Sequence, residues 1–245
     1  MPITIDTLYR YPVKTLQGEA LSAATITQNG VEGDRCWAIC RRSDGEPLAA
    51  KNYPWLMTFT GEYLDQPQAG QRTEVRIYGP DFAPVLSTDA DCDQRLSERV
   101  GESVFLRHSS VGEFFFDTAI HLLSTNTLAS LRRHQAQFAD RGASDYDPRR
   151  FRPNVLIRVE DGEAAFPEHG WLNRSLSSPA LQLAMVRPTD RCGMTTYPFA
   201  ELPSDPTSLR GVVEAAQGVA GVYANVVAGG VSHAGDVLTV SASAP

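Results

Sequence analysis

Short apolar segments, rich in β-branched and aromatic residues, recur along the chain and are separated by glycine, proline, asparagine or aspartate. This pattern is typical of half-buried β-strands that are joined by turns. It predicts strands over Ile3–Tyr9, Ala23–Thr27, Cys36–Arg41, Met57–Tyr63, Glu74–Tyr78, Val104–Arg107, Asn154–Val159, Leu181–Val186, Val222–Val227 and Val237–Ser241.

Apolar residues at helical spacing are rarer, and they predict three amphipathic helices. Each begins at residues whose side chains can cap a first turn, and two of them end near a glycine. The expected helices run from Thr88 or Asp89 to Val100 with Gly101 as the stop, from Ser124 or Asn126 through Leu128–Phe138, and from Thr207 or Ser208 through Val213–Ala216 to near Gly218. The excess of strands indicates a β-rich α+β fold, a barrel-like core with helices packed outside it.

A change of composition over Ser109–Asp117 marks the best boundary between two domains. We therefore expect an N-terminal β domain over residues 1–108 and a larger C-terminal domain over residues 109–245. A length of 245 residues is ample for one large domain or two small ones.

Composition and charge restrict the class of protein. Hydrophobic residues at 42% and charged residues at 21% are ordinary values for a globular chain. A formal net charge of −7 argues against a general nucleic-acid surface, which is normally basic. The N-terminal residues do not form a secretory signal, and no apolar run approaches the roughly 18 residues of a spanning helix. The sequence therefore predicts a cytoplasmic protein with no nucleic-acid or membrane partner.

The cysteines match neither a disulfide framework nor a zinc knuckle, and they are Cys36, Cys40, Cys92 and Cys192. Cys36 and Cys40 fall in one predicted strand, where their side chains would share a face about 13 Å apart, too far to chelate one ion. Cys192 directly follows Arg191, and a neighbouring guanidinium favours the thiolate, the form that attacks electrophiles and binds metals. The alternative is a buried and inert Cys192.

Positive charges gather in turns and at strand ends, although the chain as a whole is acidic. These positions are Lys14, Arg35, Arg149, Arg150, Arg152 and Arg191. Guanidinium groups can grip phosphate bidentately and stay charged when buried. Together with Cys192 they predict a cysteine thiolate beside an anion-binding pocket.

Each of these positions also has a purely structural interpretation. Lys14 could be an exposed charge at a strand end, and Asp34–Arg35 could be a local ion pair that fixes a hairpin. We favour a solvated turn for Arg149–Arg150. Asn154 could cap the turn before its strand, and Asp236 more simply orders a β-turn.

Six sets of residues follow one another over most of the chain. They are Tyr11-Pro12-Val13-Lys14-Thr15 with Gly18, Gly30–Trp37, His121-Leu122-Leu123-Ser124, Phe151-Arg152-Pro153-Asn154, Asp190-Arg191-Cys192-Gly193-Met194-Thr195-Thr196, and Gly221-Val222-Tyr223 with Gly235-Asp236-Val237. In this order they resemble the family of MOSC-domain proteins, named for the C-terminal domain of molybdenum cofactor sulfurase. The closer resemblance is to the branch that contains the mitochondrial amidoxime-reducing component and its bacterial relatives.

The resemblance implies an N-terminal β-barrel domain packed on a MOSC β-barrel domain with peripheral helices. It also implies a molybdenum cofactor of the molybdopterin type between the two domains, with Cys192 as the catalytic residue and the protein's sulfur ligand to the metal. The residues around the cofactor would be Lys14, Thr15, Arg35, Ser124, Arg152, Asn154, Asp190, Arg191 and Tyr223. Thr15 stands where serine is frequent in the family, a difference that keeps the hydroxyl group.

The resemblance further implies an oxidoreductase that removes the oxygen of an N-hydroxylated small-molecule substrate, leaving an amine or amidine and water. The chain stops at Pro245 without the ferredoxin-like domain that is fused to some bacterial relatives. Electrons are therefore expected from a separate ferredoxin or flavoprotein. Two other functions stay open, namely transfer of a persulfide sulfur carried on Cys192 and delivery of the intact cofactor to another enzyme.

Overall fold

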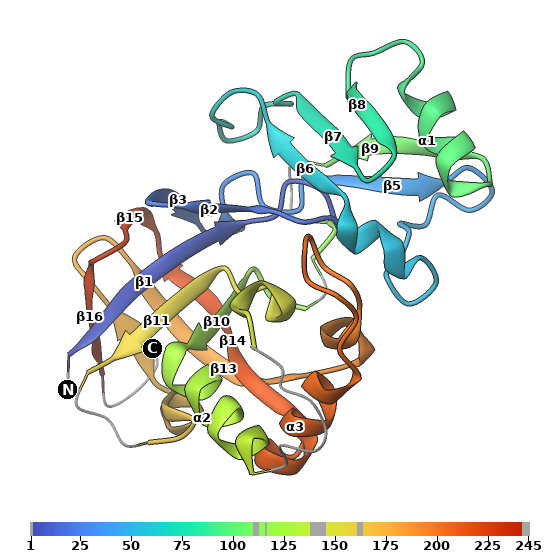
Figure 1. Cartoon of the computed structure of the whole chain (residues 1–245). Helices are drawn as coiled ribbons and strands as arrows, with labels where there is room; N and C mark the ends of the chain where they lie inside the picture. The colour runs from blue at the N-terminus through green and yellow to red at the C-terminus, as the bar shows by residue number, and fades with distance from the viewer. Residues whose placement is uncertain (1, 110–112, 116, 138–145, 161–163, 242–245) are drawn as a thin grey trace.

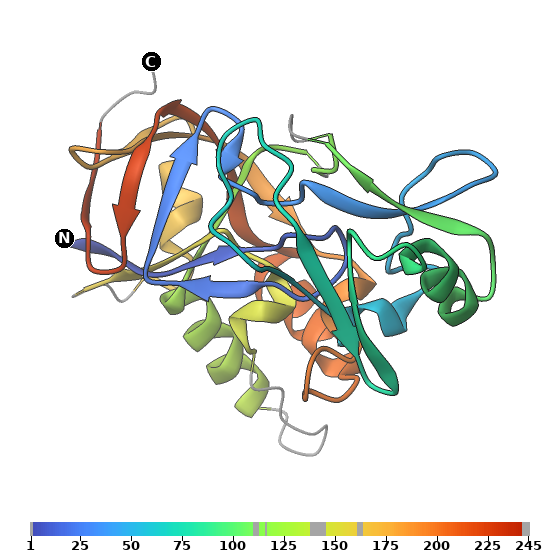
Figure 2. The same ribbon diagram turned by 90° about the horizontal axis from the view of Figure 1, so that it is seen from above.

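The computed structural model describes residues 2–109, 113–115, 117–137, 146–160 and 164–241. Its largest unit is a closed barrel of seven strands in the order β11–β10–β14–β13–β12–β16–β1, which β1 completes by pairing with β11. Strand β2 adds to β1 outside the ring (Figures 1 and 2). The bounds are β1 (Ile3–Arg10), β2 (Glu19–Leu21), β10 (Ile120–Ser124), β11 (Val155–Val159), β12 (Ser175–Ser177), β13 (Gln182–Asp190), β14 (Val219–Ala228) and β16 (Val237–Val240).

Strand β1 shows how the apolar pattern builds the barrel core. Its residues Ile3, Ile5 and Leu8 are buried in the main apolar cluster. Strict alternation would bury residue 7 instead of residue 8, but the register against β11 shifts between Ile5 and Thr7. A β-bulge of this kind changes which side chains face inward, so Leu8 reaches the core.

The first strands of the chain lie with the last ones. Strand β1 pairs antiparallel with β11 and β16, and β3 (Ala23–Thr27) pairs with β4 (Gly30–Val31) and with β15 (Gly230–His233). The pairings with β11, β16 and β15 cross the expected division between residues 1–108 and 109–245, which itself stays a prediction. Part of the boundary segment Ser109–Asp117 lies outside the described residues.

A second lobe lies beside the barrel (Figure 1). Its strands form two small sheets, β5 with β9 and β6 with β7 and β8. Trp37, Phe59 and Leu96 belong to its apolar cluster, which is separate from that of the barrel. The bounds are β5 (Trp37–Arg41), the 3-10 helix η1 (Pro54–Thr58), β6 (Thr60–Tyr63), β7 (Val75–Gly79), β8 (Phe82–Leu86), α1 (Cys92–Val100) and β9 (Val104–His108).

Two helices pack outside the barrel, α2 (Thr125–Ala136) and α3 (Pro206–Ala216) (Figure 1). The predicted cap of α2 is confirmed, because the Ser124 hydroxyl accepts a hydrogen bond from the Thr127 N–H at 3.0 Å. Short 3-10 helices connect the barrel strands, namely η3 (Pro148–Phe151), η4 (Pro167–Trp171) and η5 (Gly193–Thr196). No helix of the described part of the chain is long and apolar enough to cross a membrane.

The predicted β-rich α+β fold is therefore confirmed, with several local differences. Met57 and Thr58 lie in η1 rather than in a strand, because Pro54 favours the first turn of a helix. Helix α3 is capped by Asp205, which accepts a hydrogen bond from the Thr207 N–H, so Thr207 and Ser208 lie inside it. Phe138, the expected end of α2, lies outside the described residues.

Candidate functional site

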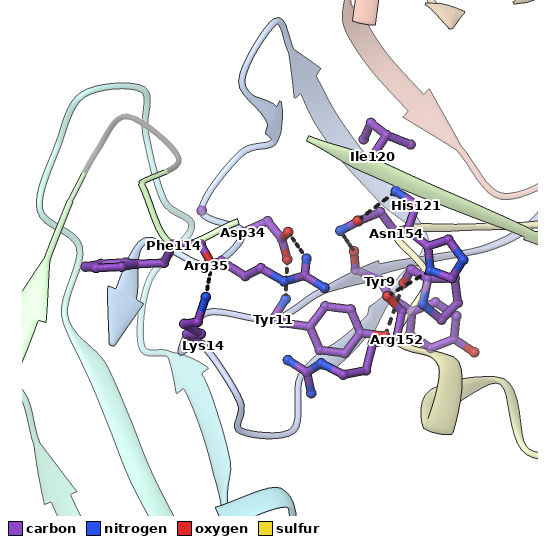
Figure 3. A network of polar contacts seen from close by, with 12 residues as sticks. Tyr9, Tyr11, Lys14, Asp34, Arg35, Phe114, Ile120, His121, Arg152 and Asn154 are labelled. Atoms are coloured by element: carbon purple, nitrogen blue, oxygen red, sulfur yellow. Dashed lines mark hydrogen bonds and ion pairs between the residues drawn. The ribbon is translucent and has the colours of Figure 1, made fainter. Parts of the chain in front are cut away.

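The segment after β1 joins the barrel to the second lobe. The Lys14 N–H donates to the Trp37 carbonyl of β5 at 2.7 Å, and the Gln17 N–H donates to the Phe59 carbonyl at 2.8 Å. The residues between, Lys14 to Leu16, therefore lie where the two units meet. The Lys14 ammonium is half-buried and donates to the Phe114 carbonyl at 2.8 Å, so it is not a fully exposed strand-end charge (Figure 3).

Tyr11 brings two of the expected cofactor residues together (Figure 3). The guanidinium carbon of Arg35 lies 4.8 Å from the centre of its ring, and that of Arg152 lies 4.2 Å from it. Arg35 also forms an ion pair with the buried Asp34, whose other oxygen accepts from the Tyr11 N–H at 2.7 Å. The local Asp34–Arg35 pair is thus present, and it orients Arg35 over the same ring as Arg152.

Three of the expected cofactor residues have left-handed backbone conformations. The φ angles are 75° at Thr15, 51° at Arg35 and 52° at Arg152. Residues with side chains rarely adopt this region, and a β-branched threonine is especially strained there. Such strain persists only where the surrounding structure enforces it, and it concentrates at functional sites.

The cluster of Lys14, Arg35 and Arg152 carries more positive charge than its surroundings balance. Burial, followed by the charge of Arg35, lowers the pKa of Arg152 to about 10. Burial and the charges of Arg35 and Arg152 also lower the pKa of Lys14. Desolvation is the leading cause of both shifts and repulsion between the neighbouring cations adds to it, and an anionic ligand would offset that repulsion.

An anion that binds this cluster should raise the pKa of Lys14. An opposite charge favours the ammonium form and so offsets part of the effect of the two arginines. The chain has one other lysine, Lys51, which is exposed and serves as an internal reference. In NMR titrations of ¹³C-labelled lysine side chains, inorganic phosphate should raise the Lys14 pKa and leave the Lys51 resonances unchanged. An equal response of both lysines would contradict a localised anion site.

Arg191 faces the barrel rather than the neighbouring sulfur. Its Nε donates to the Ala220 carbonyl at 2.8 Å, its Nη1 donates to the Phe151 carbonyl at 2.9 Å, and its Nη2 contacts His121 Nε2. These contacts tie the end of β13 to η3 and to β10. The guanidinium also interacts electrostatically with Cys192, so the effect of Arg191 on the Cys192 thiolate stays a prediction.

Cys192 differs from the other cysteines in being exposed. Cys192 is the residue directly before η5, and its carbonyl oxygen accepts a hydrogen bond from the Thr195 hydroxyl at 3.1 Å. Burial raises the pKa of Cys36 and of Cys92 to about 11, which keeps those thiols protonated. The interpretation of Cys192 as a buried, inert cysteine is therefore wrong.

The loop that carries Cys192 is anchored by Arg150. This arginine is 3% exposed and donates to the Tyr197 carbonyl at 2.9 Å and to the Pro203 carbonyl at 2.7 Å. The expectation of a solvated turn is therefore wrong for Arg150, because its charge is used inside the protein. Arg149 remains nearer the surface, where it pairs with Asp147 at 2.8 Å.

His121 is a site residue that the sequence interpretation missed. It is 5% exposed, its Nδ1 lies 3.3 Å from the Arg152 carbonyl oxygen, and its Nε2 contacts Arg191. Burial, followed by the charge of Arg191, lowers the pKa of His121 well below its usual value. The signal in the sequence was a histidine inside an otherwise apolar strand.

Gly221 leaves the space that His121 occupies. Its φ is +81°, and an added Cβ would clash with His121 Nε2 and lie 2.6 Å from the Leu122 carbonyl oxygen. We expect Gly221→Ala to lower the free energy of unfolding by about 2–4 kcal/mol in urea titrations. Gly101→Ala is the control, because Gly101 has φ +85° with no atom within 4 Å of the added Cβ, and it should cost only about 1 kcal/mol. Equal losses would show that the contact with His121 is unimportant.

Two expected cofactor residues have all their visible contacts inside the barrel. The Ser124 hydroxyl donates to Glu168 Oε2 at 2.6 Å, and Ser124 lies three residues along β10 from His121, about 10 Å away. Asn154 accepts from the His121 N–H at 3.2 Å and donates to the Tyr9 carbonyl at 3.4 Å (Figure 3). Ser124 thus lies one barrel-strand segment away from His121, and Asn154 links the backbone of His121 to that of Tyr9.

Asp190 and Tyr223 lie near the cluster and are linked by Arg187. Asp190 is exposed and accepts from Arg187 Nη1 at 3.2 Å, while the Arg187 guanidinium carbon lies 4.9 Å from the centre of the Tyr223 ring. The Tyr223 ring lies 5.8 Å from the imidazole of His121. Thr15 has a different partner from these residues, because its hydroxyl donates a hydrogen bond to the Leu48 carbonyl at 2.9 Å.

A metal at this site would need ligands from outside the polypeptide. Within the described residues, no three or more His, Cys, Asp or Glu side chains are grouped to hold a metal ion. One exposed thiol beside strained, buried cations suits a metal that arrives with its own anionic ligand set, because a soft thiolate matches a soft, sulfur-rich centre. The donor set therefore fits an anionic, metal-carrying cofactor.

Two family models together cover almost the whole chain. The family model described as MOSC N-terminal beta barrel domain matches residues 2–109, and that of the MOSC domain matches residues 81–239. No curated protein matches the chain.

Solved structures match the chain at low sequence identity. The YUAD protein from Bacillus subtilis is 13% identical, with a TM-score of 0.52 over 98% of this chain and 96% of that chain. A hypothetical protein is 12% identical, with a TM-score of 0.46 over 98% of this chain and 68% of its own. YiiM from Geobacillus stearothermophilus is 12% identical, with a TM-score of 0.34 over 50% of this chain and 54% of its own. At such identity, the similarity to the YUAD protein shows the fold alone.

Proposed function

This chain belongs to the family of MOSC-domain proteins, and on that premise we propose that it binds a molybdenum cofactor and acts as an oxidoreductase. The observation that carries the proposal is that Arg35 and Arg152 meet over the Tyr11 ring, near Lys14, and that Arg191, which precedes the exposed Cys192, bonds to Phe151, which precedes Arg152. A molybdopterin cofactor combines a phosphate with a sulfur-bound metal, and these residues supply the complementary groups.

The roles of the residues follow from their surroundings. Lys14, Arg35 and Arg152 would bind the anionic groups of the cofactor, and the Cys192 sulfur would be the protein's ligand to the metal. Arg191 holds the Cys192 segment against the barrel, since its guanidinium bonds to the carbonyls of Phe151 and Ala220. Cys192 is exposed, so a substrate can approach this side of the site.

The proposed reaction is the reduction of an N-hydroxylated small molecule to its amine or amidine and water, with the uptake of two electrons and two protons. The bound cofactor would supply the two-electron redox chemistry that side chains cannot perform. The residues of this chain would bind and orient the cofactor and leave the metal accessible. We propose a separate ferredoxin or flavoprotein as the electron donor.

Turnover of cofactor-loaded protein tests the reaction. The protein would be purified from a host that makes the cofactor and mixed with an N-hydroxylated amidine and a chemical reductant. We expect one amidine to form for each N-hydroxylated amidine consumed. Cys192→Ser should not catalyse this reaction. Loaded protein that exchanges cofactor rapidly without turnover would instead show a carrier. A labile sulfur on Cys192 without molybdenum would show persulfide transfer.

A further inference from the structure

Two of the arginines in the site come from separate parts of the chain and meet at one histidine. Arg152 ends η3, Arg191 follows the last residue of β13, and His121 is the second residue of β10. We infer that His121 is a positioning residue, which fixes Arg191 and the backbone of Arg152 in the arrangement that binds the cofactor. This inference rests on the proposed function.

The two ring nitrogens of His121 have different partners. Nε2 contacts Arg191 Nη2, and Nδ1 lies 3.3 Å from the Arg152 carbonyl oxygen. A guanidinium can only donate and a carbonyl can only accept. The neutral tautomer with its hydrogen on Nδ1 and an acceptor at Nε2 satisfies both of these contacts, and the Ala220 carbonyl also lies within hydrogen-bonding reach of the ring.

The surroundings of His121 support this neutral form. Its imidazole is buried and faces the charge of Arg191, and both effects lower its pKa well below the usual value. A protonated ring would lose the acceptor at Nε2 and place a second positive charge against the guanidinium. The pairing with Arg191 thus requires the form that burial already favours.

The position of the ring is fixed on several sides. The His121 N–H donates to Asn154 Oδ1 at 3.2 Å, and Asn154 is itself tied to Tyr9 of β1. Gly221 provides space that any Cβ would fill, and the Tyr223 ring lies 5.8 Å away. His121 therefore has little freedom to turn away from either arginine.

The contact with Arg152 bears on its strained backbone. Arg152 has φ 52°, and its side chain reaches the Leu16 carbonyl at 2.6 Å. The hydrogen bond from His121 Nδ1 to its carbonyl helps to hold this unfavourable conformation. Removing the imidazole would take away the hydrogen bond at the Arg152 carbonyl and one of the two acceptors of Arg191 Nη2, which would keep only the Ala220 carbonyl at 2.5 Å.

Two substitutions separate the functions of the two nitrogens. His121→Gln places an amide oxygen near the former Nε2 and keeps an acceptor for Arg191. His121→Asn places an amide nitrogen near the former Nδ1 and keeps only the donor to Arg152. Leu176→Ala is the stability control, because Leu176 is fully buried and pairs with Leu183, seven residues from Asp190 on β13.

Molybdenum and pterin per chain are measured together with the melting temperature of each variant. We expect both variants to lower cofactor content about tenfold or more, His121→Asn through the lost acceptor for Arg191 and His121→Gln through the lost donor to Arg152. Leu176→Ala should lower the melting temperature and keep the cofactor. Wild-type cofactor content in either His121 variant, or losses that merely follow melting temperature, would overturn the inference.

A second measurement needs no cofactor. In ¹⁵N NMR of the cofactor-free wild type, His121 should show hydrogen on Nδ1 and titrate well below the usual histidine pKa, because its imidazole is buried and faces Arg191. A ring that carries its hydrogen on Nε2, or that titrates near its usual pKa, would overturn the inference. Wild-type protein without any molybdenum would overturn the proposed function instead. The NMR result on His121 would still stand in that case, because it is measured on cofactor-free protein.

Discussion

Cys192→Ser is expected to remove molybdenum from the protein and to abolish its N-reductive turnover, while the fold stays intact. Cys192 is exposed, so its side chain contributes little to packing, and the free energy of unfolding should change by no more than about 0.5 kcal/mol. A serine hydroxyl is a much poorer ligand than a thiolate for a soft metal centre. Metal content should fall at least about tenfold, as measured by elemental analysis of the purified protein.

Cys92→Ser is the matched control for this experiment. Cys92 is buried at the start of α1 in the second lobe, and burial raises its thiol pKa to about 11. This variant makes the same chemical change at a remote position. It should lower the melting temperature and keep the metal, the opposite of the result for Cys192→Ser. Stoichiometric metal in Cys192→Ser would show that this sulfur is not an essential ligand.

Arg152→Gln is expected to lose the cofactor without weakening the cofactor-free protein. Burial lowers the Arg152 pKa from the usual arginine value to about 10, and Arg152 is 8% exposed. A shift of this size corresponds to about 3 kcal/mol against the folded state. Because folding disfavours the charged form, this cost is fully present below the folded-state pKa and is relieved only as the pH rises through it.

The gain from removing this charge is partly offset by a lost hydrogen bond. Arg152 donates to the Leu16 carbonyl at 2.6 Å, and a charged hydrogen bond contributes about 1.5–3 kcal/mol. The free energy of unfolding of cofactor-free Arg152→Gln should therefore stay the same or rise by about 1 kcal/mol. Arg158→Gln, at an exposed arginine of β11, is the control and should keep both stability and cofactor. Full cofactor content in Arg152→Gln would contradict an anion-binding role.

Local sequence patterns predicted the strands that have clear boundaries, and they missed a strand that is buried along its whole length. Strands β1, β3 and β11 were recognised because their residues are β-branched and their ends carry turn residues. Strand β10 was missed because all of Ile120–Ser124 is buried and α2 follows at once. Such a short apolar run shows no alternation, and periodicity cannot distinguish it from a helix.

The site was predictable where its chemistry lies in one segment. Cys192 and the cationic residues Lys14, Arg35 and Arg152 could be identified from short motifs. Arg150 was misassigned because its burial depends on carbonyls 47 and 53 residues away along the chain. The same limit applies to His121, whose partners are 31 and 70 residues distant and meet it only in the folded barrel.

The most direct test of the account is the molybdenum and pterin content of the wild-type protein, purified from a host that synthesises the cofactor. The exposed Cys192 and the cationic cluster of Lys14, Arg35 and Arg152 predict close to one molybdenum and one pterin per chain. Protein that is folded under these conditions and contains neither molybdenum nor pterin would contradict the account.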